Sequence, residues 1–180
     1  MPFAQRLNKE PAVLRGARWL LVITLALTAV ACGPKLITGR APFVSIAGMT
    51  LDGGSLETSY DIANQNGVKM NIDEFEVRVT LETAELAHLL RREKLPIDAN
   101  SSERVTDRSQ PDDSALDPLR SLESGDTDSL PFSLEGRVHT LDDGYLRFEQ
   151  KGHLYRVPGR PGQFRAAVMR ASELVRENKL

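Results

Sequence analysis

The chain has 180 residues, with 23 Lys and Arg against 25 Asp and Glu, for a formal net charge of −2. This balance excludes a strongly basic nucleic-acid-binding protein, which would gather Lys and Arg in one segment or on one face. The chain has one cysteine, Cys32, and this excludes an intramolecular disulfide. Stability must therefore come from the burial of apolar side chains.

The first 31 residues have the layout of a secretory signal. Residues 1–18 contain four basic side chains and one acid, and residues 19–31, "WLLVITLALTAVA", carry no charge. Thirteen uncharged residues are too few for a membrane-spanning helix, which needs about 20. They match the apolar core of a signal peptide behind a basic segment. We therefore predict that residues 1–31 are removed as a signal peptide.

The cysteine stands directly after this apolar run. "AVAC" followed by Gly33 resembles the lipobox of bacterial lipoproteins, in which the cysteine receives a diacylglycerol and becomes the acylated first residue. The resemblance implies lipidation at Cys32, a linker over residues 32–42 and a place in the bacterial envelope. The lack of Asp after Cys32 favours the outer membrane, facing the periplasm. The alternative is a plain secretory signal or an N-terminal anchor with an incidental cysteine.

The remainder of the chain is acidic and, once Cys32 is acylated, has no thiol. Four of the 23 basic residues and one of the 25 acids lie in residues 1–32, which leaves 19 bases and 24 acids, a net charge of −5. Thiolate catalysis and cysteine-based metal sites are excluded. A length of 148 residues suits one domain with a core of its own.

Several segments alternate apolar and polar residues with the period of a half-buried strand. They follow an opening strand near 43–51 and are "LETSYDIA" (56–63), "EFEVRVTL" (74–81), "PFSLEGRVHTL" (131–141) and the closing "YLRFEQKGHLYRV" (145–157). One apolar face per strand favours antiparallel sheets packed face to face. We therefore predict an all-β fold, an antiparallel β-sandwich.

Glycine-containing turns separate these strands. "DGG" at 52–54, Asn66-Gly67 and Asp143-Gly144 are typical of tight turns. In the closing strand, Leu146 and Phe148 have one parity whereas Tyr155 and Val157 have the other. Lys151-Gly152 between them is therefore predicted to form a β-bulge.

Two segments favour helix. Residues 107–130 are polar and acidic, and Ser114 is predicted to cap a short helix that ends near Gly125. At the end of the chain, residues 161–180 place apolar side chains at helical spacing: Phe164, Val168, Ala171 and Val175. This spacing predicts an amphipathic C-terminal helix.

The stretch "YDIANQNGVKMNIDEFEVRVTLETAELAH" resembles the core of the late embryogenesis abundant type 2 family, also called the water stress and hypersensitive response (WHy) domain. Asn64 and Asn66 hold the two Asn places of the family's Asn-Pro-Asn-like turn, with Gln65 in place of Pro. The resemblance implies a seven-stranded β-sandwich of fibronectin-like shape over residues 43–160. Asn64, Asn66 and Gly67 are expected to form a structural turn, with Asn accepting left-handed angles and bonding open backbone groups.

Nothing in the sequence indicates a catalytic centre, a cofactor or a metal site. The three histidines, His88, His139 and His153, lack the spacing of a metal site and are predicted to be solvated. The acids between Asp107 and Asp128 lack the order of a calcium loop. A solvated acidic loop is expected there, with weak calcium binding as the alternative.

The family resemblance implies a non-enzymatic protein that protects against desiccation, osmotic stress or freezing. Its partners would be the membrane, through the N-terminal lipid, and client proteins bound without specificity. No specific partner is implied. The alternative is an envelope scaffold or a binding module for a protein or an apolar ligand, with strand edges and loops as the contact sites.

Overall fold

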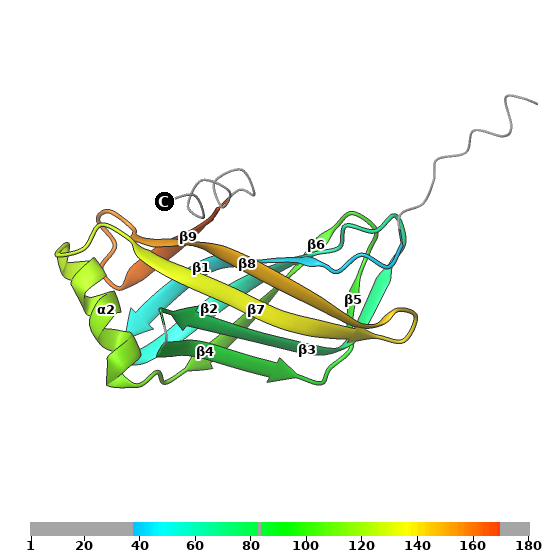
Figure 1. Ribbon diagram of the computed structural model, residues 1–180, viewed down its shortest axis with the longest axis horizontal. Helices are drawn as coiled ribbons and strands as arrows, with labels where there is room; N and C mark the ends of the chain where they lie inside the picture. The colour runs from blue at the N-terminus through cyan, green and yellow to red at the C-terminus, as the bar shows by residue number, and fades with distance from the viewer. Residues whose placement is uncertain (1–37, 83, 170–180) are drawn as a thin grey trace, which may run out of the picture. The chain divides into compact units, whose positions relative to one another are not determined.

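A computed structural model describes residues 38–82 and 84–169 of the chain. In this part, nine strands form one antiparallel sheet and one helix covers an end of it (Figure 1). The strands are β1 (Phe43–Asp52), β2 (Ser55–Ala63), β3 (Met70–Leu81), β4 (Ala84–Arg91), β5 (Leu95–Ile97), β6 (Ser102–Ser109), β7 (Leu130–Thr140), β8 (Gly144–Arg156) and β9 (Gln163–Val168). The helix is α2 (Asp113–Ser124).

The sheet rolls into a barrel-like shape. Its strand order is β4-β3-β7-β8-β9-β1-β2-β6, with the short β5 paired to β3. The two edge strands, β4 and β6, are joined by side-chain hydrogen bonds. Arg91 Nη2 donates to the Thr106 carbonyl at 2.7 Å, and Ser109 Oγ donates to the Leu86 carbonyl at 3.4 Å. The predicted all-β antiparallel fold is confirmed. The seven-stranded sandwich is not, because nine strands form one continuous sheet.

The strand β9 replaces the start of the predicted C-terminal helix. Residues 163–168 pair with β8 on one side and with Met49 and Thr50 of β1 on the other. The helical prediction for this part is wrong because Phe164 and Val168, four residues apart, share a face in a helix and also in a strand. Residues 170–180, the rest of that prediction, lie outside the described residues.

The predicted inward side chains fill the core. Leu56, Tyr60 and Ile62 of β2 are fully buried. On β3, the buried side chains are the four predicted ones, Phe75, Val77, Val79 and Leu81, joined by Met70 and Ile72. Full burial of one such side chain contributes about 1.5–3 kcal/mol. Across the interior, Phe75 meets Tyr60 edge-on and stacks on Phe148, at centroid distances of 6.5 and 6.1 Å.

Two of the three predicted turns are hairpins. Gly53 and Gly54 join β1 to β2 with φ of 56° and 86°, and Gly144 begins β8 with φ of 71°. Such angles favour glycine because it has no Cβ. The third turn differs: β2 and β3 do not pair with each other, and Asn66-Gly67 is no hairpin. Neither Asn64 nor Asn66 has a positive φ, so the expected left-handed angle is also wrong.

The predicted bulge at Lys151-Gly152 is absent. β7 and β8 pair without a shift from Leu130↔Leu154 to Thr140↔Gly144. Leu154, and not Tyr155, therefore points inward. Gly152 also faces inward, and a Cβ there would lie 2.2 Å from the Ala167 carbonyl oxygen and 2.8 Å from Phe132 Cε1. The glycine is needed for close packing against Ala167 and Phe132, and it does not form a bulge that changes which side chains of β8 face inward.

Helix α2 closes one end of the barrel, against β4, β7 and β8 (Figure 1). Its N-cap is Asp112 and not the predicted Ser114, whereas its end at Gly125, with φ of 89°, matches the prediction. Its buried side chains are Ala115, Leu116, Leu119 and Leu122. Residues 38–40 lie at the opposite end, beside the β7–β8 hairpin. Within the described ranges, no helix has the length and apolarity to cross a membrane.

Candidate functional site

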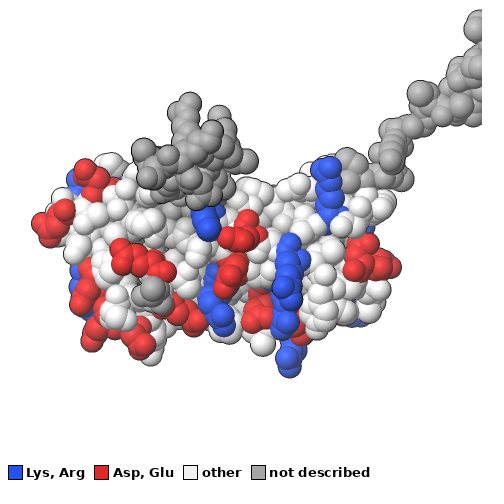
Figure 2. Space-filling model, in the orientation of Figure 1, with Lys and Arg blue, Asp and Glu red and all other residues white. Residues whose placement is uncertain are grey.

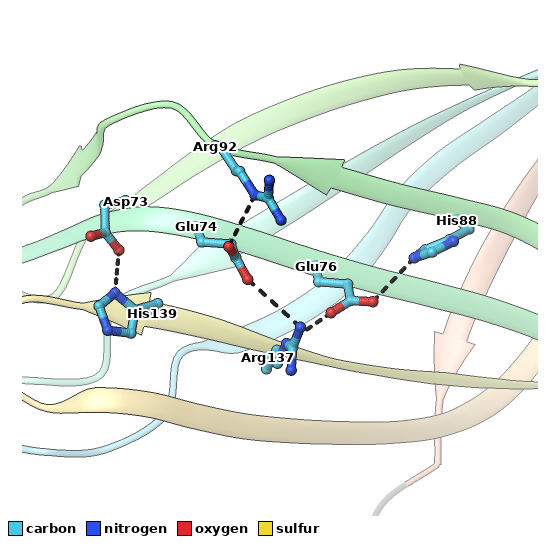
Figure 3. A network of polar contacts seen from close by, with 7 residues as sticks. All are labelled: Asp73, Glu74, Glu76, His88, Arg92, Arg137 and His139. Atoms are coloured by element: carbon cyan, nitrogen blue, oxygen red, sulfur yellow. Dashed lines mark hydrogen bonds and ion pairs between the residues drawn. The ribbon is translucent and has the colours of Figure 1, made fainter.

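The most connected polar cluster lies on the outer face of β3, β7 and β4 (Figure 3). Arg137 is at its centre: Nε lies 2.8 Å from the Glu76 carboxylate, and Nη2 lies 3.7 Å from that of Glu74. Glu74 also meets Arg92 at 3.2 Å, and Glu76 meets His88 at 3.2 Å. We call these residues, together with Asp73 and His139, the outer-face network.

A β-bulge brings Asp73 into this network. Pairing of β3 with β7 shifts between Ile72 and Glu74, which leaves Asp73 as the extra residue. A bulge re-aims a side chain by breaking the strict alternation of faces. The Asp73 carboxylate consequently lies 2.6 Å from His139 Nδ1. The His139 ring in turn lies 4.6 Å from that of Tyr145, over which Arg137 is placed at 5.1 Å.

The network sets the charge state of Glu76. Partial burial acts to raise its pKa, but the hydrogen bond with His88 and the positive charge of Arg137 outweigh this and hold the pKa below its ordinary value. On the opposite part of the barrel, the hydrogen bond from Arg104 likewise lowers the pKa of Asp61. These carboxylates are ionised at neutral pH and paired with cations.

A shallow hollow adjoins the network. It measures about 620 Å³ and spans the outer face of β3, β7 and β8. Three arginines and three glutamates line it, with Gly136 and Phe148 at its floor: Glu76, Arg78, Glu135, Arg137, Arg147 and Glu149. Such a surface holds water and can take a ligand of mixed charge, but it offers little apolar contact.

The network supplies charge and no activated nucleophile. The Asp73–His139 contact has the form of a carboxylate that orients an imidazole. A hydrolytic triad would also need a hydroxyl or thiol bonded to that imidazole. Among residues 38–82 and 84–169, the structure has no such bond to His88 or His139, and no group of three metal-ligating side chains.

The predicted turn residues lie at the end of the barrel opposite α2. Asn64 is buried, and its Nδ2 donates to the carbonyls of Val68, Ile97 and Asp98 at 2.8, 3.1 and 3.1 Å. Its Oδ1 accepts from the Asn66 amide at 2.9 Å. The Asn66 side chain exchanges two hydrogen bonds with the backbone of Arg40, both at 3.0 Å.

The other predicted residues are dispersed. His88 and His139 are in the network, whereas His153 is on β8, and its ring faces that of Tyr155 at 6.4 Å. The acids between 107 and 128 are spread over β6, α2 and the loops around them. Cys32 lies outside the described residues. The ion pairs of the network were not predicted; alternation placed their members on outer faces, but strand register, which the sequence leaves open, decides which of them meet.

The chain matches no known protein family and no curated protein. The solved structures that are similar to it include the following two. One is a crystal structure of a protein from Archaeoglobus fulgidus, with 9% identity and a TM-score of 0.42, and the match covers 68% of this chain and 98% of that one. The other is the X-ray structure of Northeast Structural Genomics Consortium target SoR45, with 10% identity and a TM-score of 0.43, over 68% and 92%.

The pKa of Glu76 gives a direct test of the network. In Arg137→Gln we expect this pKa to rise toward its ordinary value, because a favourable charge is lost. A depressed carboxylate pKa stabilises the fold above the pKa of the unfolded chain, and this contribution disappears as pH falls through the folded-state pKa. The variant should therefore lose less stability on acidification. NMR titration of the Glu76 carboxyl carbon measures the shift. Arg108→Gln, whose partner is Glu57, should leave it unchanged.

Proposed function

We propose that this chain is a non-enzymatic lipoprotein of the bacterial envelope, tethered through Cys32, whose barrel protects neighbouring proteins during loss of water. The protein would act through weak, nonspecific contacts of a hydrated surface. The observation that carries this proposal is the outer-face network with its adjoining hollow, where charged side chains of both signs gather and pair with one another.

The distribution of charge is consistent with this mechanism. Figure 2 shows acidic and basic side chains interspersed over the middle of the visible face, whereas acidic side chains predominate at the end where α2 lies. A mixed and hydrated surface contacts many partners weakly, because no single charge or apolar area dominates the encounter. The Asn64 and Asn66 bonds to backbone groups also agree with the structural role that the resemblance to the WHy domain implies.

Protection of a drying-sensitive enzyme tests the proposed function. The acylated protein in detergent, added before drying and rehydration, is expected to preserve more enzyme activity than an equal mass of albumin in the same detergent. Because the proposal assigns the effect to the charged face, a double variant that neutralises a glutamate and an arginine of the hollow, Glu149→Gln with Arg147→Gln, should protect less. Protection no better than that of albumin would contradict the proposal.

The hollow also supports the second candidate, an envelope binding module. Its Arg147 and Glu135 side chains are exposed, and the structure gives neither of them an ion pair among the described residues. An extended peptide with charges of both signs would suit such a surface. Crosslinking in intact envelopes separates the candidates: one stoichiometric partner favours the binding module, and a broad distribution of partners favours protection.

A further inference from the structure

We propose that the barrel end carrying Val68 and Leu141 is a membrane-docking surface that rests on the bilayer to which the chain is tethered. This inference depends on the proposed lipid anchor at Cys32. It adds an orientation: the barrel end opposite α2 faces the lipid, and α2 faces away from it.

Two loops at this end present apolar side chains to solvent. Leu141, at the tip of the β7–β8 hairpin, is 78% exposed, and Val68, in the loop between β2 and β3, is 38% exposed. The loops lie at the same end because Thr140, next to Leu141, pairs with Ile72 near the start of β3. An isolated exposed leucine is common, but two apolar loop tips at one end of a barrel form a surface that can enter a lipid interface.

The chain enters the barrel at this same end. Arg40 is held by the two hydrogen bonds with the Asn66 side chain, and Asn64 of the same turn donates to the Val68 carbonyl. A Cβ on Gly39 would lie 3.5 Å from the Asp143 side chain, in the Leu141 loop. The point where the chain leaves the barrel is therefore fixed between the two apolar loops.

The length of the connection between Cys32 and the barrel limits how far the barrel can lie from the membrane. Six peptide links join Cys32 to Thr38, and they reach about 20 Å when fully extended. The longest strand, β8, has 13 residues and spans about 43 Å. An acyl chain at Cys32 thus keeps residue 38, and with it the Leu141 end, within about 20 Å of the lipid headgroups, whereas α2 lies at the far end of the barrel.

The charges at this end select the kind of membrane surface. Asp98, Asp142 and Asp143 are exposed beside Arg40 and Lys69, and Lys69 is paired with Asp98 at 3.0 Å. Because acids outnumber bases here, attraction to anionic headgroups does not drive the contact. A bilayer of zwitterionic lipid, entered by the leucine and valine side chains, fits these residues.

A thiol-reactive fluorophore locates the docked end. The acylated full chain carries Asp142→Cys, which leaves Leu141 in place, or, as the matched control at the opposite end, Ser124→Cys on the exposed last turn of α2. Both are labelled and reconstituted into phosphatidylcholine vesicles that contain a lipid spin-labelled near the headgroup. We expect the probe at 142 to lose most of its fluorescence to the spin label, and the probe at 124 to keep it.

Equal quenching of the two probes, or no quenching at 142 in protein that floats with the vesicles, would overturn the docking proposal and leave the anchor intact. Labelling and flotation of the unsubstituted chain distinguish a failure of the docking proposal from a failure of the lipid anchor. If Cys32 is acylated, it takes no fluorophore and the protein floats. If it takes the fluorophore and does not float, the proposed function fails in its anchor, and the docking proposal fails with it.

Discussion

Replacing Asn64 with alanine is expected to lower the free energy of unfolding by about 3 kcal/mol, because it removes the bonds of a buried polar side chain. The amide of this side chain donates to three carbonyls, from Val68, Ile97 and Asp98, and its oxygen accepts from the Asn66 amide. Alanine supplies none of these bonds, and those to the Ile97 carbonyl and from the Asn66 amide are buried, where water does not readily replace them. Urea unfolding followed by circular dichroism measures the difference.

Asn71→Ala is the matched control. Asn71 lies in the same region, at the start of β3, but its side chain is exposed, so its loss should change stability by less than about 0.5 kcal/mol. If the two variants unfold at the same urea concentration, the Asn64 side chain does not hold the β2–β3 connection together, and our account of this end of the barrel is wrong.

Gly152→Ala is expected to destabilise the barrel by about 3 kcal/mol, since the new methyl group overlaps atoms that cannot all move aside. One of these atoms is the Ala167 carbonyl oxygen, at 2.2 Å from the ideal Cβ position. The backbone of β9 would have to shift, and the bond from the Met169 amide to the Lys151 carbonyl, now 2.8 Å, would weaken. Faster amide hydrogen exchange across β9 reports this change.

Gly48→Ala provides the comparison. The nearest atom to a Cβ on Gly48 is the Phe164 carbonyl oxygen at 4.0 Å, and its φ is not in the left-handed region. Alanine therefore fits, and its reduced freedom in the unfolded chain should leave stability unchanged or raise it by about 0.5 kcal/mol. A Gly152→Ala protein as stable as Gly48→Ala would show that β8 and β9 are not packed as closely as described.

The sequence predicted features that depend on neighbouring residues. Alternation over residues 74–81 placed Phe75 and Val77 in the core, and Gly53-Gly54 and Gly144 marked two hairpins, because these patterns report local backbone geometry. Gly125 likewise marked the end of α2. Such features need no knowledge of which strands are neighbours.

The errors arose where distant segments decide the structure. Phe164 and Val168 fit helix and strand equally well, and only the open edges of β8 and β1 select the strand. Gly152 looked like a bulge because its partner, Phe132, lies 20 residues earlier in the sequence and fills its place. The contact of Asp73 with His139 needs both the β3 bulge and the β7 register, and neither is visible in one sequence.

The central claim is a lipid-tethered barrel, and acylation at Cys32 tests it most directly. In cells fed a labelled fatty acid, the account predicts label on the unsubstituted protein, which should sediment with the membranes. Cys32→Ala should carry no label, because the chain has no other cysteine. This variant lacks the acyl chain that would make the protein sediment with the membranes. Label retained by Cys32→Ala, or an unsubstituted protein without label, would contradict the account.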